Sequence, residues 1–405
     1  MAVFVSEGRP VGSRLRAAME IRRTLSSVLR TPRSHMNVLT RDVWPPRIAL
    51  SNARRALWPP RTAISTIRRV RDVWPPLLAI AKVAKVTFWF IWATPLIFGY
   101  LASADSRGSP QDVLWFALVV GGVCFVESIN CIHNELMDQE EDAANQPRRG
   151  TLIASVGEPT LWLLVVFGYA VCVVGIIPIA IFVGLDVAAL IVGASIAPVL
   201  YNSGPRLKRR PVLAELAIGW AAFCTYLTGW AFNEPIEDAP AVIWLFTYFF
   251  AVTSFLKDLP DVAGDELVGA PGVFSIRRSA LRRGALVFVY LSPYALVVAL
   301  VVAGSLPERM LFLCSLCPVA LWLMVIGDRV SSLPTMIAAY ELAFLYVHVF
   351  FLAMFILYTP TPPAVIAAAV LFAARMTVLY LGLAPRFVEP DFDWSSSFGA
   401  LVRRT

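Results

Sequence analysis

Residues 112–142 read DVLWFALVVGGVCFVESINCIHNELMDQEED. The part from Asp112 to Ile132 is mostly apolar, and five carboxylates then follow within the eight residues from Glu135 to Asp142. An apolar run of this length can cross about 30 Å of hydrocarbon as an α-helix. The stretch therefore predicts a membrane-spanning helix that ends in an acidic segment.

The whole chain has the composition of a membrane protein. Of its 405 residues, 58% are hydrophobic and only 16% are charged, and the mean hydropathy is +0.68. A soluble domain usually carries about 25% charged residues, so we expect an integral, multi-pass membrane protein. Apolar segments long enough to span lie near residues 84–102, 112–134, 158–181, 186–202, 212–232, 239–257, 284–304, 308–328, 335–358 and 363–384. They predict an all-α, polytopic bundle of nine or ten transmembrane helices.

The chain outside these segments divides into two further parts. Residues 1–78 form a predicted basic extension, ahead of a membrane domain at 79–385 and a short tail at 386–405. Fifteen arginines and four acidic residues within residues 1–76 give that region a net charge of +11. The sequence W-P-P recurs in it at Trp44, Trp58 and Trp74. Tryptophan and arginine both favour membrane surfaces, so the extension is either membrane-peripheral or a flexible leader.

Charge in the loops predicts the orientation. With the N-terminus on the cytoplasmic or equivalent side, the loops of that side hold fifteen Lys and Arg residues, against Arg107 and Arg309 on the other. Cytoplasmic loops carry such an excess. The acidic segment would then face the cytoplasmic side.

The carboxylates of that segment follow a helical repeat. Asn134, Asp138 and Asp142 are spaced by four residues, and Glu127 and Asn130 extend the same stripe towards the membrane interior. Residues at this spacing share one face of a helix. Polar groups at membrane depth usually point into a bundle or cavity, so the stripe predicts a polar chamber.

A second acidic stretch, SFLKDLPDVAGDELVG, occupies residues 254–269. Lys257, Asp261 and Asp265 are again spaced by four, with Asp258 beside them. Clustered carboxylates suit Mg²⁺, which binds through a few carboxylates together with phosphate oxygens of a substrate. Metal and nearby cations stabilise the charge that develops on a leaving diphosphate. Arg149, Lys208 and Lys257 are the cations that we expect to contact phosphate.

These motifs resemble those of UbiA-type intramembrane prenyltransferases. N-E-x-x-D-x-x-x-D, from Asn134 to Asp142, is similar to their first aspartate-rich motif. K-D-L-P-D-V-A-G-D, from Lys257 to Asp265, is similar to the second motif of homogentisate and chlorophyll-type members. Tyr201, Pro205 and Lys208 match a weaker third feature. Glu135 departs from the pattern, since aspartate is usual there.

The resemblance implies a helix bundle around a central cavity and assigns roles to individual residues. Catalysis and Mg²⁺ binding would fall to Asp138, Asp142, Asp261 and Asp265. Substrate binding would involve Asn134, Lys257, Asp258, Arg149, Tyr201 and Lys208. Tyr201, Trp220, Tyr226, Tyr248 and Phe255 are aromatic candidates for the cavity wall, whereas His133 points away from Asn134 and suits a structural role.

The expected activity is transfer of an isoprenyl group from an allylic isoprenyl diphosphate to an aromatic or quinone-precursor acceptor, with Mg²⁺ as cofactor. The expected partners are these two substrates and the lipid bilayer, and no nucleic acid. A membrane terpene cyclase and transfer to a non-aromatic acceptor are alternatives on the same fold. A transporter or scaffold is the non-enzymatic alternative. The D-G-x-x-A-R core of CDP-alcohol phosphotransferases is absent from the sequence.

Overall fold

The computed structural model describes residues 75–103, 110–139, 142, 149–261, 279–330 and 332–380. The chain divides into two units, Met1–Ile64 and Ser65–Thr405, and every described residue belongs to the second unit. The predicted extension up to residue 74 and the predicted tail at 386–405 lie outside the described residues. The first described helix begins at Pro75, within the stretch assigned above to the extension.

All regular elements of the described residues are helices, as predicted. In the first half of the unit they are α4 (Pro75–Val83), η1 (Val86–Phe88), α5 (Trp89–Ser103), α6 (Pro110–Met137), α8 (Arg149–Val156), α9 (Glu158–Phe182), α10 (Leu185–Asn202), η2 (Leu207–Arg209) and α11 (Pro211–Trp230). In the second half they are η3 (Ile236–Asp238), α12 (Val242–Ser254), η4 (Phe255–Asp258), α14 (Ser279–Val302), η5 (Glu308–Leu316), α15 (Cys317–Arg329), α16 (Leu333–Tyr358) and α17 (Pro362–Tyr380).

Nine helical segments in the described part of the chain are long and apolar enough to cross a membrane. Each coincides with one of the ten predicted segments. The tenth prediction, 239–257, corresponds to α12, which has 13 residues. At 1.5 Å per residue α12 is about 20 Å long, shorter than the hydrocarbon layer. Nine of the ten predicted segments thus have the length of a span, and α12 with η4 is a shorter helical segment that carries the chain back across the bundle between α11 and α14.

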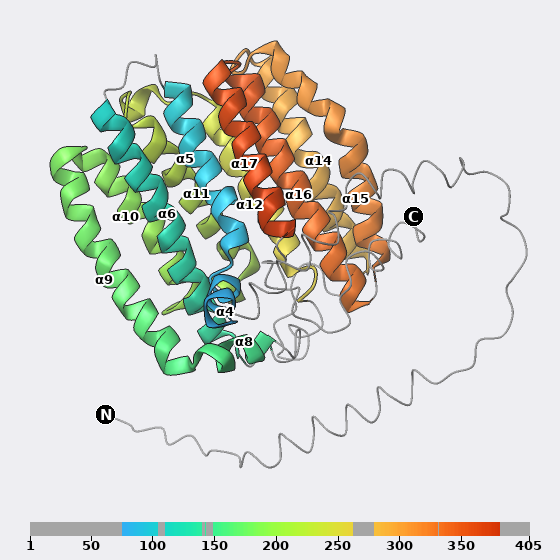
Figure 1. Cartoon of the computed structure of the whole chain (residues 1–405). Coiled ribbons are helices and arrows are strands. Elements are labelled where there is room, and N and C mark those ends of the chain that lie inside the picture. Colours follow the sequence, from blue (N-terminus) through green and yellow to red (C-terminus); the bar gives the residue numbers. More distant parts are fainter. Residues whose placement is uncertain are drawn as a thin grey trace, which may run out of the picture. The chain divides into compact units, whose positions relative to one another are not determined.

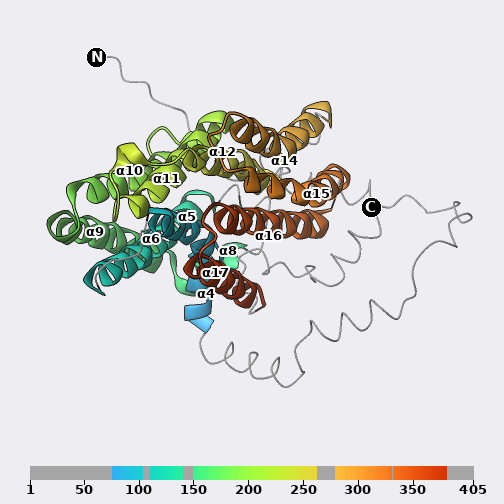
Figure 2. The ribbon, with the colours of Figure 1, turned by 90° about the horizontal axis from the view of Figure 1, so that it is seen from above.

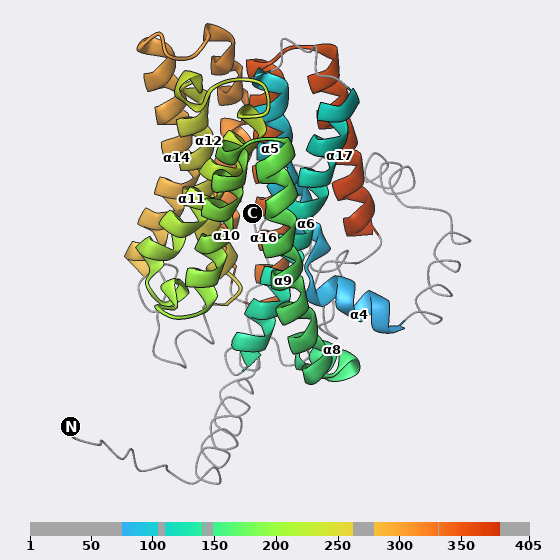
Figure 3. The ribbon, with the colours of Figure 1, turned by 90° about the vertical axis from the view of Figure 1, so that its left-hand side faces the viewer.

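Successive long helices alternate in direction (Figure 1). The C-terminal end of α6, the η2 loop between α10 and α11, and the C-terminal end of α12 therefore lie at the same end of the bundle. Figure 3 shows α4 and α8 at that end too. We call it the motif end, since it carries the predicted motifs.

The closest approach between helices joins α5 and α11. A Cβ atom on Gly99 would overlap the carbonyl oxygen of Tyr226, and one on Gly229 would overlap that of Leu96. Only glycine allows the two backbones to come this near, as is common between membrane helices. The pair forms a rigid centre, with α9 and α10 on one side and α14 and α15 on the other when seen from above (Figure 2).

Buried side chains form two clusters. The larger cluster joins α5, α11, α12, α14, α15, α16 and α17, with Phe98, Phe246 and Phe355 fully buried in it. The smaller cluster joins α4, α6, α8 and α9 through Ile129, Leu161 and neighbours. The side chains packed among α4, α6, α8 and α9 therefore form a cluster of their own, separate from the larger core.

Candidate active site

The motif end brings together residues from four helix ends. Asp138 follows α6 directly, Tyr201 lies in the last turn of α10, and Lys208 lies in η2. Lys257 and Asp258 lie in η4, which continues α12. The separate sequence motifs thus meet where these helices end.

The first motif keeps its helical register beyond the end of α6. The Asp138 N–H donates to the carbonyl of Asn134 over 3.0 Å, and the Asp142 N–H donates to that of Asp138 over 2.7 Å. These i to i−4 bonds hold Asn134, Asp138 and Asp142 on one face, as the spacing predicts. All three side chains are partly buried.

Lys208 provides a positive charge to the first motif. Its Nζ contacts Oδ1 of Asp138, and the two side chains are 8% and 13% exposed. The loop that carries Lys208 is held in place by Arg206, whose Nη2 donates to the carbonyl of Met137 over 3.2 Å. Lys208 therefore faces the first motif.

The second motif has a buried ion cluster. The Nζ of Lys257 lies 2.5 Å from Oε1 of Glu215 in α11 and 3.4 Å from Oδ1 of Asp258. Burial by itself lowers the pKa of Lys257, but the carboxylates of Asp258 and Glu215 outweigh it and raise that pKa well above its ordinary value. The Asp261 N–H donates to the carbonyl of Asp258 over 3.1 Å and so places Asp261 close behind.

Tyr201 links the two motifs. Its hydroxyl lies within electrostatic range of Asp138 from the first motif and of Lys257 and Asp258 from the second. The ammonium of Lys257 lies 5.8 Å from the centre of the Tyr201 ring, within cation–π distance. The two acidic motifs therefore approach one shared tyrosine.

Two carboxylates that share this region were not assigned by the sequence motifs. Glu215 is 3% exposed and pairs with Lys257. Glu135 is 2% exposed, and its Oε1 lies 2.8 Å from Nζ of Lys85. The longer side chain in place of the usual aspartate thus reaches a lysine that precedes η1. A glutamate at the start of an apolar span was the available signal for Glu215.

The residues present suit a divalent cation. Asp138 and Asp142 lie one helical turn apart, and Asp258 and Asp261 lie on the neighbouring segment. Mg²⁺ prefers such carboxylate oxygens. Within the described ranges, no group of three His, Cys, Asp or Glu side chains is placed so that it could hold a metal ion. Asp265 and the side chain of Arg149 lie outside the described residues.

His133 belongs to a hydrogen-bond network beside the motif. Tyr169 donates to Oδ1 of Asn130 over 2.9 Å, and its hydroxyl lies 3.1 Å from Nδ1 of His133. The Nε2 of His133 lies 3.1 Å from the hydroxyl of Ser203. The network ties α6 to α9 and to the η2 loop, which agrees with the structural role expected for this histidine.

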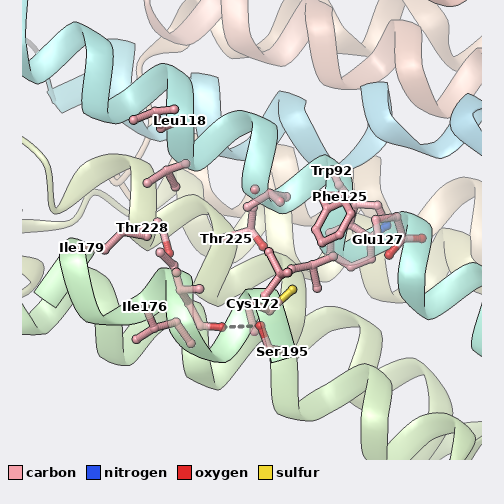
Figure 4. Close-up of a pocket in the computed structure, with 18 of the residues that line it drawn as sticks. Trp92, Leu118, Phe125, Glu127, Cys172, Ile176, Ile179, Ser195, Thr225 and Thr228 are labelled. Atoms are coloured by element: carbon pink, nitrogen blue, oxygen red, sulfur yellow. Dashed lines mark hydrogen bonds between the residues drawn. The ribbon is translucent and has the colours of Figure 1, made fainter. Parts of the chain in front are cut away.

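An apolar cavity of about 290 Å³ lies among α5, α6, α9, α10 and α11 (Figure 4). Glu127 and Asn130 of the predicted stripe lie in its wall, but the rest of the wall is mostly apolar, unlike the polar chamber that the stripe predicts. Its aromatic side chains are Trp92, Trp115 and Phe125. The expected aromatic candidates are not among its lining residues. Trp220 is 52% exposed on the outer face of α11, and Tyr226 is fully buried in the core.

Solved structures that resemble this chain are distant in sequence. One, of digeranylgeranylglyceryl phosphate synthase in membranes, has 16% identity and a TM-score of 0.49, and the match covers 71% of this chain and 100% of that chain. Another, of a UbiA homolog from Archaeoglobus fulgidus bound to GPP and Mg²⁺, has 14% identity and a TM-score of 0.48, over 68% of this chain and 99% of that chain. The same homolog bound to DMAPP and Mg²⁺ has 16% identity and a TM-score of 0.46, and the match covers 68% of this chain and 98% of that chain. No curated protein matches this chain.

The family of the chain is shown by the match of one family model. The model of the UbiA prenyltransferase family matches residues 92–332, which is more than half of the chain. The matched region includes both acidic motifs, Tyr201, Lys208 and the cavity. The chain belongs to the UbiA prenyltransferase family and is an integral, multi-pass membrane prenyltransferase.

Proposed function

We propose that the protein transfers an isoprenyl group from an allylic isoprenyl diphosphate to an aromatic or quinone-precursor acceptor, and that it requires Mg²⁺. The observation that carries the proposal is that each acidic motif pairs a carboxylate with a lysine at the same end of the bundle, Asp138 with Lys208 and Asp258 with Lys257. Asp138 comes from one motif and Lys257 with Asp258 from the other, and Lys208 faces Asp138. Carboxylates and ammonium groups at one site are the components that bind a metal–diphosphate head.

Each group has a defined part in this proposal. Asp138, Asp142, Asp261 and Asp265 would hold Mg²⁺, with Asn134 and Asp258 in support. Bound Mg²⁺ would neutralise charge on the departing diphosphate. Lys208 and Lys257 are held by carboxylates, so each ammonium is oriented before substrate arrives, and preorganised charge is more effective than charge that must reorganise. Arg149, at the start of α8, would be a further contact to phosphate.

The apolar cavity completes the proposal. Its polar end, at Glu127 and Asn130, is one to two helical turns from Asn134, and apolar side chains line the remainder. An isoprenyl tail is insoluble in water and would be stabilised against these side chains by burial of its surface. Water excluded from this region would also be kept from the carbocation formed when diphosphate leaves.

The orientation and the N-terminal extension are part of the same proposal. From the basic loops we infer that the motif end faces the cytoplasmic or equivalent side. The diphosphate would then enter from the aqueous phase at the motif end, and residues 1–78 would contact anionic lipid at the surface.

The test uses the full chain in liposomes with geranyl diphosphate as donor, Mg²⁺, and methyl para-hydroxybenzoate as acceptor. Mass spectrometry should detect the prenylated acceptor, in an amount that depends on Mg²⁺. A hydrocarbon formed without acceptor would instead support the terpene-cyclase alternative. Recovery of intact donor and acceptor from folded protein, with this donor and with longer ones, would contradict both.

A further inference from the structure

One ionisable side chain in the cavity wall lies outside both acidic motifs. Glu127 lies on α6, seven residues before Asn134, which places it two turns or about 10 Å deeper along the helix. Seven residues bring a side chain back to the same face, so Glu127 lies beneath the first motif. It is the one ionisable carboxyl group among the residues that line this cavity. A carboxyl group at membrane depth is costly to bury, so it is a candidate functional group.

The other polar side chains in the wall are already engaged. The hydroxyls of Ser195, Thr225 and Thr228 donate to carbonyls one turn earlier in their own helices, over 2.7–2.8 Å. Such bonds are typical of hydroxyls in apolar helices. These three residues therefore present mainly their aliphatic atoms to the cavity, and the polar recognition available to a ligand is concentrated at Glu127 and Asn130.

The surroundings of Glu127 hold it as a hydrogen-bond acceptor. The Cys131 thiol donates to its Oε1 over 3.3 Å. Trp92 and Asn130 also lie within hydrogen-bonding reach of the carboxylate. Figure 4 shows Trp92 beside Glu127 at one end of the cavity, with Leu118 and Ile179 at the other. A carboxylate has about four acceptor positions, so these donors leave room for one from a ligand.

We propose that Glu127 binds the hydroxyl of a neutral hydroxyaromatic acceptor, and that it selects against acceptors that carry a carboxylate. This inference rests on the proposed transfer reaction and names the acceptor class. The acceptor ring lies at the Glu127 end of the cavity, between Trp92 and the first motif, and donates its hydroxyl proton to Glu127 in a hydrogen bond. The isoprenyl chain lies beside the ring along the apolar wall.

Charge explains the selection. An acceptor hydroxyl replaces its bond to water by a bond to Glu127, whereas a carboxylate placed in the same apolar cavity would face a like charge. Like charges at a desolvated contact cost several kcal/mol. Neutral acceptors, such as a phenol ester or a hydroquinone, should therefore be preferred by tenfold or more over their acidic counterparts.

The experiment compares para-hydroxybenzoic acid with its methyl ester, at mildly alkaline pH, in liposomes with geranyl diphosphate and Mg²⁺. The ratio of kcat/KM for ester over acid should be at least about ten in the native protein. Glu127→Gln keeps the shape and removes the charge, so the ratio should fall towards one. Glu127→Asp keeps the charge and should keep the preference, at a higher KM for the ester. Thr225→Val is the matched control, because its hydroxyl is bonded within its own helix, and it should leave the ratio unchanged.

Diphosphate release is measured in the same samples and separates the two proposals. Release that depends on Mg²⁺, together with an unchanged ratio in folded Glu127→Gln, would overturn the role of Glu127 and leave the transfer reaction standing. A preference of the native protein for para-hydroxybenzoic acid over its methyl ester would also overturn the role of Glu127. If Glu127→Gln does not fold, Glu127→Asp and the native ratio still decide the outcome. Absence of diphosphate release under every condition would overturn the transfer reaction and this inference with it.

Discussion

The ammonium of Lys257 lies 2.5 Å from Oε1 of Glu215, although the two residues belong to different helices and are 42 positions apart. Oε2 of Glu215 is buried without a hydrogen-bond partner. A glutamate in this setting holds the lysine side chain in one orientation. Under the proposed function, Glu215 would therefore be a positioning residue that acts on the diphosphate through Lys257.

Replacement of Glu215 tests this positioning. Glu215→Gln should raise the KM for the prenyl diphosphate about tenfold while it changes kcat less, because a hydrogen bond to a charged group contributes about 1.5–3 kcal/mol. Steady-state kinetics with a fixed acceptor would measure both constants. Asp328→Asn is the control, since Asp328 pairs with the exposed Arg283 over 3.2 Å, and it should change neither. An unchanged donor KM in folded Glu215→Gln would refute the positioning role.

The pH dependence provides an independent test. The pKa of Lys257 is raised by Asp258 and Glu215, so its ammonium is present at and below the ordinary lysine pKa of about 10.4 and is lost only as pH rises through the raised value. The native enzyme should therefore show no alkaline loss from Lys257 below that pH. Glu215→Gln removes one of the carboxylates that outweigh burial, so the alkaline limb of the activity profile should move to lower pH. If the alkaline limbs of the activity profiles coincide in the native protein and in Glu215→Gln, the stabilisation of the Lys257 ammonium by Glu215 is contradicted.

Two lysines that both contact first-motif carboxylates should differ in their effects. Lys208 meets Asp138, which faces the site, so Lys208→Met should lower kcat/KM for the donor about a hundredfold, the loss typical of one group that stabilises developing charge. Lys85 meets Glu135, which is buried between α6 and the start of η1. Lys85→Met should lower thermal stability and leave the donor KM unchanged, because it leaves a buried charge with less compensation. Kinetics and thermal unfolding of both variants would show whether the effects separate in this way.

The centre of the bundle depends on the close approach of α5 and α11. Gly229→Ala would place a methyl group on the backbone of Leu96 and should destabilise the protein by about 1–3 kcal/mol, the usual effect of overpacking. Gly121→Ala, where a Cβ meets nothing within 4 Å, is the control and should be neutral or stabilising, because alanine favours helix. Denaturant unfolding in detergent would measure the difference. Equal stability of the two variants would show that the helices can separate without loss.

The fold was largely predictable because hydropathy reports directly which residues can face lipid. Each of the ten apolar segments is helical, and in the segment predicted at 239–257 the chain ends its regular helix at Ser254 and continues as a tighter turn to Asp258. The stripe from Glu127 to Asp142 was also predictable, since its spacing alone places its members on one face.

The partners of those residues were not predictable from spacing. Glu215 and Lys257 meet because α11 and α12 pack side by side, and Glu135 meets Lys85 because the chain turns sharply at Lys85, where φ is 47°. Which aromatic side chains line the cavity of Figure 4 was also not predictable from spacing. Aromatic residues are common in membrane helices, and only the rotation of each helix decides that Trp92 and Trp115 face the cavity whereas Trp220 faces outward.

The most direct test of the shared site is a Mg²⁺ titration of diphosphate release from geranyl diphosphate, carried out on the native protein, Asp138→Asn and Asp261→Asn. The two aspartates come from different motifs, so the account predicts that each substitution alone raises the Mg²⁺ concentration for half-maximal release and lowers the maximal rate by a hundredfold or more, with Asp328→Asn unchanged. Native-like titration curves in either folded aspartate variant would contradict the claim that the two motifs form one metal–diphosphate site.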